Sequence, residues 1–144
     1  MENKACPPRS FRWDLHGLQI LVVDDDLPCL ESIETYLVSD GHRVLTATGG
    51  LEALDRARHL KRENQILDLS ILDFHMPDLT GIETFTRLVE EFPLVAGIFI
   101  SGDASISLER LVREAGGRAL VPKPLDLFRV RNLISELHRE RGDA

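Results

Sequence analysis

The strongest constraint on the fold is that short runs of strand character alternate five times with longer segments of helical periodicity. The strand-like runs are mostly apolar and contain β-branched residues, as expected for buried strands. They cover residues 18–23, 42–48, 69–73, 95–101 and 118–121. The apolar faces of the helical segments fall at residues 30–37, 51–60, 82–92, 108–115 and 127–137.

Strands that are each followed by a helix predict one parallel sheet, because right-handed crossovers then place helices on both of its faces. The expected fold class is an α/β three-layer sandwich with a five-stranded parallel sheet. A length of 144 residues suits a single domain. Residues 1–17 are polar, contain Pro7 and Pro8 and show no sustained periodicity. They are predicted to be an N-terminal arm or linker remnant, and residues 18–144 the domain.

Net charge, cysteine content and the length of the apolar runs limit which partners the protein can bind and in which cellular compartment we expect it. The formal net charge of −7 argues against a nucleic-acid partner, which would need clustered Lys and Arg. The two cysteines, Cys6 and Cys29, give neither a disulfide framework nor a metal-binding spacing. The longest apolar run, residues 94–100, is too short to span a bilayer, and residues 1–17 lack the apolar centre of a signal peptide. The sequence therefore predicts a cytoplasmic protein with no nucleic-acid or membrane partner.

Side chains suited to chemistry stand at the carboxyl ends of four predicted strands. These ends share one edge of a parallel sheet, where open α/β sheets bind their ligands. Three carboxylates gathered there need a cation, since two charges about 5 Å apart repel by roughly 3 kcal/mol at an effective dielectric of about 20. Mg²⁺ fits, because it prefers oxygen ligands and binds through a few carboxylates plus a phosphate. The residues are Asp24, Asp25, Asp73, Ser101 and Lys123.

Asp73 is the candidate nucleophile of this pocket. A carboxylate that attacks phosphorus forms an acyl phosphate. The three phosphoryl oxygens would then meet the metal, the Lys123 ammonium and the Ser101 hydroxyl. Other acids nearby have simpler expected roles: Asp26 as the N-cap of the first helix, and Asp103 as the N-cap of the fourth. Asp78 is expected to be a turn residue.

Four motifs stand in order along the chain: ILVVDDD, ILDFHMPDLTG, IFISGD and VPKP. Successive separations between Asp25, Asp73, Ser101 and Lys123 are 48, 28 and 22 residues. In this order and spacing the motifs resemble those of the response-regulator receiver domain of two-component signalling. The resemblance covers about residues 18–139. Any one motif is a weak signal, but four in register are specific.

The resemblance implies a sheet order and a set of metal ligands. The strand order would be 2-1-3-4-5, which is the flavodoxin-like order. By matching position, Asp73 would be the phosphoacceptor. The Mg²⁺ ligands would be Asp24, Asp25, Asp73 and the backbone carbonyl of His75.

The same resemblance implies a switch. Ser101 matches the switch hydroxyl, and Lys123 matches a lysine whose bond to the following proline, here Pro124, is usually cis. Leu120 stands where receivers often have Tyr or Phe, so an aromatic rotamer switch coupled to Ser101 is not expected. Phosphorylation is expected to repack the face made by the fourth helix, fifth strand and fifth helix.

The implied function is that of a phosphoacceptor receiver. A sensor histidine kinase or a histidine phosphotransfer protein would donate the phosphoryl group, and the altered face would bind an output protein. Transfer and loss of the group would be self-catalysed, so no turnover enzyme is expected. A phosphorylation-independent interaction module is the alternative, although the presence of all five pocket residues favours the receiver. A metal-dependent phosphatase is a more distant hypothesis, because His75 stands where it would need a second acid.

Overall fold

The computed structural model describes residues 17–103 and 105–142, so the arm predicted for residues 1–17 lies outside the described residues except for Gly17. In the described part, five strands alternate with five helices, none of which is long and apolar enough to cross a membrane. The strands are β1 (Gln19–Val23), β2 (Arg43–Ala47), β3 (Leu69–Asp73), β4 (Ala96–Ser101) and β5 (Ala119–Pro122). The helices are α2 (Leu27–Ser39), α3 (Gly50–Arg62), α4 (Gly81–Glu91), α5 (Ile106–Glu114) and α6 (Leu127–Gly142).

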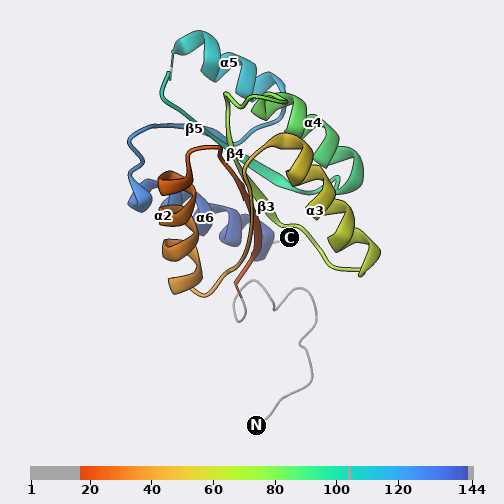
Figure 1. Cartoon of the computed structure of the whole chain (residues 1–144). Coiled ribbons are helices and arrows are strands. Elements are labelled where there is room, and N and C mark those ends of the chain that lie inside the picture. Colours follow the sequence, from red (N-terminus) through yellow and green to blue (C-terminus); the bar gives the residue numbers. More distant parts are fainter. Residues whose placement is uncertain (1–16, 104, 143–144) are drawn as a thin grey trace.

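The strands form one parallel sheet in the order β2-β1-β3-β4-β5, which confirms the predicted order (Figure 1). The chain leaves β1 toward one edge of the sheet and then returns past it to β3. Crossovers that diverge in this way open a crevice at the carboxyl ends of the two strands between which they diverge, here β1 and β3. Val23 of β1 is paired with Leu72 of β3, so the residues that follow them lie side by side.

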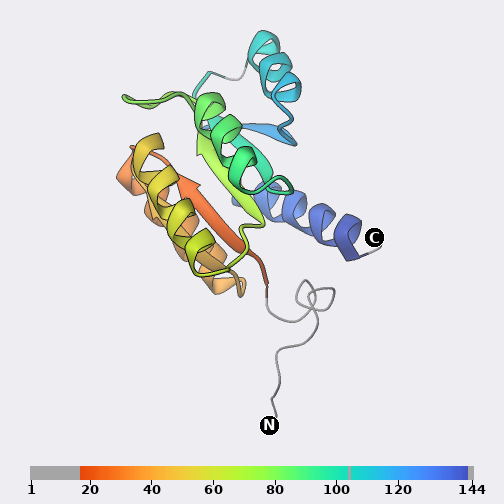
Figure 2. The same ribbon diagram turned by 90° about the vertical axis from the view of Figure 1, so that its right-hand side faces the viewer.

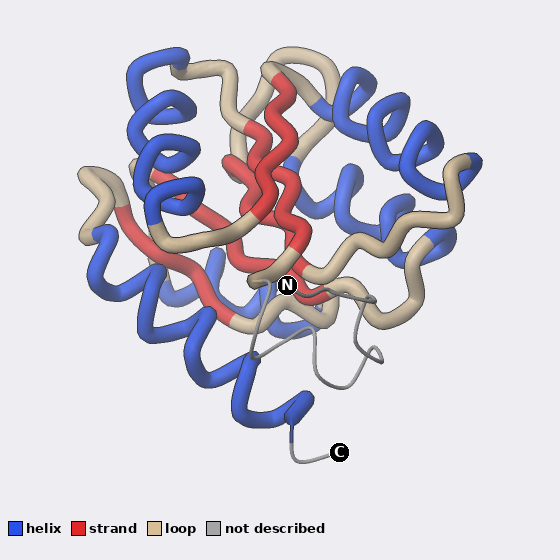
Figure 3. Tube along the Cα trace, turned by 90° about the horizontal axis from the view of Figure 1, so that it is seen from below, coloured by secondary structure: helices blue, strands red, loops and turns tan. Residues whose placement is uncertain are grey.

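Helices cover both faces of the sheet. Helices α2 and α6 lie on one face, and α3, α4 and α5 on the other (Figures 1 and 2). Side chains alternate between the faces along each strand. In β1, Ile20 and Val22 pack with residues of α2 and α6, whereas Leu21 and Val23 pack with the opposite layer. Seen from below, the strands lie between the helices, which confirms the three-layer sandwich (Figure 3).

One glycine determines how closely α4 can approach the end of β3. A Cβ atom added at Gly81 would lie 2.6 Å from the carbonyl oxygen of Asp73, closer than real Cβ atoms come. The amide of Gly81 donates to the carbonyl of Phe74 at 2.9 Å and so closes the intervening loop. The missing side chain therefore lets α4 begin directly beside Asp73.

Several strand ends differ from the predictions by one residue, and two element boundaries have a physical explanation. Helix α5 begins at Ile106, and its N-cap is Ser105, whose hydroxyl accepts a backbone hydrogen bond at 3.2 Å. The prediction of Asp103 as that cap is therefore wrong, whereas Asp26 caps α2 as predicted. Strand β5 ends at Pro122, one residue later than predicted. As an edge strand, β5 tolerates a residue without an N–H group.

Candidate functional site

Three carboxylates meet where β1 and β3 end. Asp24 follows β1 directly, Asp25 comes next, and Asp73 is the last residue of β3. One oxygen from each carboxylate lies within 4.8 Å of the other two. Asp24 is fully buried and Asp73 is 5% exposed, whereas Asp25 faces solvent. The structure thus brings together the three acids that the sequence placed at one sheet edge.

The donor set of this cluster fits a hard divalent cation. Mg²⁺ is usually held by one or two carboxylates together with waters and phosphate oxygens. Within the described residues, the buried Oδ2 atom of Asp24 accepts no hydrogen bond, although the Lys123 ammonium lies 3.0 Å away. The other oxygen, Oδ1, accepts a hydrogen bond from the amide of Asp26 at 2.9 Å, which fixes the carboxylate. Coordination of a metal would satisfy the remaining oxygen.

Lys123 brings a positive charge to the acids. Its Nζ atom donates a hydrogen bond to Oδ1 of Asp24 at 3.3 Å and lies 3.6 Å from Oδ2 of Asp73. Burial favours the neutral amine, but the hydrogen bond and charge of Asp24, together with Asp73, outweigh burial and raise the pKa of Lys123. The peptide bond between Lys123 and Pro124 is cis, as the resemblance implied. At neutral pH the Lys123 amine is thus a cation, and it lies close to two of the three acids.

Asp73 binds its proton unusually tightly when no metal is present. Burial and then the charge of Asp24 raise the pKa of Asp73 from 3.8 to about 7, and Lys123 offsets only part of this rise. Ionised Asp73 is therefore costly in the metal-free protein near neutral pH. A divalent cation at the cluster would favour the carboxylate, which is the form that attacks phosphorus.

This raised pKa predicts how the stability of the metal-free protein depends on pH. From about pH 4 to about pH 7, folded Asp73 keeps a proton that the unfolded chain has lost, so its contribution to stability falls as the pH rises. We expect Asp73→Asn, which is always neutral, to match the wild type near pH 4. Near pH 8 its free energy of unfolding should be higher by about 1–3 kcal/mol. Urea denaturation in EDTA measures the free energy of unfolding of the wild type and of Asp73→Asn at each pH. A difference between the two proteins that stays constant with pH would contradict the expectation.

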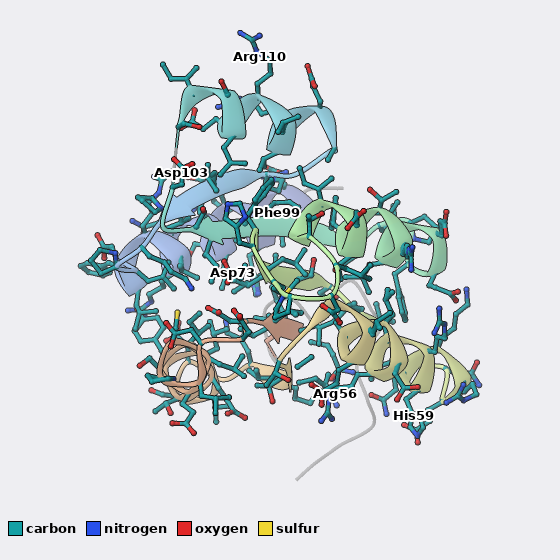
Figure 4. All side chains as sticks on the ribbon, turned by 45° about the horizontal axis from the view of Figure 1, so that its top comes forward. Arg56, His59, Asp73, Phe99, Asp103 and Arg110 are labelled. Carbon is teal, nitrogen blue, oxygen red and sulfur yellow. The ribbon has the colours of Figure 1, made fainter. Side chains whose placement is uncertain are left out.

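Ser101 ends β4 and is fully buried. Its hydroxyl donates to the carbonyl of Asp103 and accepts from the amide of Asp103, each at 3.0 Å. Figure 4 shows Asp73 among the strand ends and Asp103 on the loop that leads to α5. The Ser101 hydroxyl is therefore bonded to the backbone of its own loop in the described conformation.

His75 lies in the loop after β3 and is exposed. Its ring makes an edge-to-face contact with Phe74, with 4.8 Å between the ring centroids. Its expected contribution to the site comes from the backbone carbonyl, so it does not depend on the imidazole. On that expectation, the site would use the backbone of this loop and not the imidazole of His75.

The sequence model of the response regulator receiver domain family matches residues 20–135. The chain belongs to this family. Among its relatives, this receiver domain is 35% identical over 126 residues to the transcriptional regulatory protein PrrA of Mycobacterium tuberculosis, covering 88% of the chain and 52% of PrrA. It is 29% identical over 119 residues to the transcriptional regulatory protein ZraR of Klebsiella oxytoca, covering 83% of the chain and 26% of ZraR. The receiver domain thus spans about half of one relative and about a quarter of the other.

Solved receiver domains share this fold. The response regulator receiver domain protein from Clostridium thermocellum matches with a TM-score of 0.75 at 27% identity, over 86% of this chain and 96% of that one. A CheY-like receiver domain protein from Methanospirillum hungatei matches with a TM-score of 0.71 at 28% identity, over 85% and 98% of the two chains. These matches agree with the sheet order described above.

The roles of two residues, Cys29 and Asp78, were not predicted from the sequence. Burial, and after it the Asp24 carboxylate, raises the pKa of the Cys29 thiol to about 12. Asp78, which was expected to be only a turn residue, accepts hydrogen bonds from the first amides of α3. The signal available for Asp78 was the pair Gly49 and Gly50, because a helix that starts with two glycines has no side chain to cap it.

Proposed function

We propose that this receiver domain takes a phosphoryl group onto Asp73 from the phosphohistidine of a sensor histidine kinase or a histidine phosphotransfer protein. The observation that carries the proposal is the cluster of buried Asp24 and Asp73 with exposed Asp25, beside which the Lys123 ammonium lies. Each pair of charges at such separations repels by about 3 kcal/mol. A cluster this costly is explained by a ligand that brings positive charge and by a chemical step that needs a carboxylate.

The transfer step exchanges one bond to phosphorus for another. A carboxylate oxygen of Asp73 bonds to phosphorus while the bond from phosphorus to the donor imidazole breaks, and the electron pair returns to the imidazole nitrogen. Mg²⁺ held by the three carboxylates and the His75 carbonyl would offset the charge on the phosphoryl oxygens. Lys123, 3.6 Å from Asp73, supplies a second positive charge. Attack of water on phosphorus later releases phosphate and restores Asp73, so both steps are self-catalysed.

The switch begins at Ser101. A phosphoryl oxygen on Asp73 competes with the Asp103 backbone for the Ser101 hydroxyl, and capture of the hydroxyl releases the loop that leads to α5. Leu120 is buried in the core, so the loop, rather than an aromatic rotamer, carries the change. The face formed by α5, β5 and α6 is the proposed output surface for a protein partner. The first residue of α5, Ile106, is 81% exposed.

Intact-mass measurement on the full chain tests this function. The chain is incubated with a small phosphodonor such as acetyl phosphate, in the presence of either Mg²⁺ or EDTA. We expect the mass of one phosphoryl group to be added with Mg²⁺ and none with EDTA. No added mass in Mg²⁺ would refute the proposal and favour a phosphorylation-independent interaction module.

The proposal also covers the bounds and the location of the domain. We assign residues 18–144 to the receiver domain, and the family match to residues 20–135 supports this assignment. Response regulators are typically cytoplasmic, and we expect the same location here. The net charge of −7 supports a protein rather than a nucleic acid as the direct output partner.

A further inference from the structure

We propose that Asp78 is a positioning residue, which fixes the loop between β3 and α4 by bonding to the start of the neighbouring helix α3. The inference rests on the proposed function, because this loop carries the His75 carbonyl that is assigned to Mg²⁺. Asp78 itself is exposed and is not one of the metal ligands. Its effect on the site is therefore exerted through the loop backbone.

The carboxylate of Asp78 joins two segments that are distant in sequence. Its Oδ1 atom accepts a hydrogen bond from the amide of Gly50, and its Oδ2 atom accepts one from the amide of Leu51, each at 3.0 Å. Oδ1 also accepts from the amide of Leu79 in its own loop at 2.7 Å. These amide bonds, led by that of Leu51, lower the pKa of Asp78. One ionised side chain thus ties the loop to the first turn of α3.

Helix α3 lacks a cap of its own. The first amides of a helix have no partner within the helix, and the side chain of the N-cap residue usually accepts from one of them. The N-cap of α3 is Gly49, which has no side chain. Asp78 takes over this role from another segment and places a negative charge at the positive end of the helix dipole.

The two glycines at the start of α3 make room for the loop. A Cβ atom on Gly49 would lie 3.0 Å from Oδ2 of Asp78, and one on Gly50 would lie 2.8 Å from Cβ of Leu79. Gly49 has an extended backbone with φ of −165°, which any residue can adopt, so space rather than conformation explains the glycine there. Figures 1 and 2 show the loop that follows β3 beside the start of α3.

Asp78 completes the attachment of the loop. At the other end, the amide of Phe74 donates to the carbonyl of Ile100, and the amide of Gly81 donates to the carbonyl of Phe74, each at 2.9 Å. The backbone of His75 lies between these fixed ends and Asp78. Loss of the Asp78 contact would leave the His75 carbonyl without a fixed direction. Substitution of a residue that holds a metal ligand in its orientation typically weakens metal affinity by about 10–100-fold.

Calorimetric titration of the full chain with Mg²⁺ tests the proposal. We expect Asp78→Ala to raise the Mg²⁺ dissociation constant about tenfold, at the low end of the range for residues that orient a metal ligand. Asp78→Asn keeps one carbonyl acceptor for the α3 amides and should raise the dissociation constant about threefold. Gly49→Ala crowds the same carboxylate from the opposite side without changing any charge, and should also raise the constant about threefold.

Glu52→Ala is the matched control. Glu52 lies in the same first turn of α3, where its side chain accepts a hydrogen bond from the amide of Thr48 at 2.7 Å. Its removal weakens the start of the helix, while the hydrogen bonds from the α3 amides to Asp78 stay in place. We expect the midpoint temperature of thermal unfolding to fall as it does in Asp78→Ala. The Mg²⁺ dissociation constant should stay within about twofold of the wild-type value.

The outcomes separate this inference from the proposed function. If the wild type binds Mg²⁺ and gains a phosphoryl group while Asp78→Ala binds Mg²⁺ equally well, the positioning role is wrong and the function stands. Equal weakening in Glu52→Ala would also overturn the positioning role, because it would show a general effect of α3 stability. A wild type that binds no Mg²⁺ would overturn both proposals. If Asp78→Ala does not fold, Asp78→Asn and Gly49→Ala give the answer.

Discussion

Asp73→Asn is expected to gain no phosphoryl group under conditions that phosphorylate the wild type. The amide oxygen of Asn is a much weaker nucleophile than a carboxylate, and loss of a nucleophile usually lowers the rate by at least about 10³-fold. The variant should remain folded, because Asn fills the same space and removes one of three crowded negative charges. Intact mass after incubation with Mg²⁺ and acetyl phosphate gives the result directly.

An exposed acid serves as the control for this variant. Asp55 lies on the exposed side of α3 and is not part of the acid cluster. Asp55→Asn changes the net charge by the same amount and should be phosphorylated at the wild-type rate. Phosphorylation of Asp73→Asn at that rate would contradict the assignment and place the acceptor on another residue.

Lys123→Met is expected to lower both the stability of the metal-free protein and the rate of phosphorylation. It would leave the fully buried Asp24 carboxylate without its cation, and breaking a buried ion pair from one side costs about 3–5 kcal/mol. Because Lys123 is partly exposed and a proton on Asp73 replaces some of the lost charge, we expect about 2–3 kcal/mol in EDTA near pH 8. Mg²⁺ should restore most of this stability. The phosphorylation rate should fall about a hundredfold, as when one donor to a developing charge is removed.

Lys61→Met is the matched control, since it removes a lysine from an exposed ion pair. The Lys61 ammonium lies 3.4 Å from Oε1 of Glu91, and both side chains are exposed to solvent. Surface pairs of this kind contribute about 0–1 kcal/mol. Urea denaturation with and without Mg²⁺ compares the two variants. Equal losses for Lys123→Met and Lys61→Met, or a loss for Lys123→Met that Mg²⁺ does not reduce, would contradict the electrostatic account of the pocket.

The acids of the pocket could be predicted from the sequence because their positions follow from where strands end. Asp24 and Asp73 each terminate an apolar run, and the pairing of parallel strands brings such ends to one edge. Ser101 and Lys123 follow the same rule at β4 and just after β5. Strand boundaries within about one residue were enough, since side chains at neighbouring strand ends lie within a few ångströms of one another.

Contacts between segments could not be predicted in the same way. Asp78 follows a proline in a loop, a pattern typical of a turn, and its bonds to α3 depend on how that loop packs in three dimensions. The α5 cap was missed for a related reason. Ser105 and Asp103 are both good capping residues, and the first residue of the helix, Ile106, is exposed. The helix was located from its buried apolar face, and that face begins at Leu108. The exposed side chain of Ile106 does not belong to it, so the pattern did not show where the helix starts.

The most direct test of the central claim is the position of the phosphoryl group in the wild-type chain. Borohydride supplies hydride that reduces an acyl phosphate, releasing phosphate and converting the phosphorylated Asp into homoserine. After incubation with Mg²⁺ and acetyl phosphate, peptide mapping should find homoserine at position 73 and at no other acid. Homoserine at another position, or unmodified Asp73 in a chain that has gained the mass of a phosphoryl group, would contradict the claim.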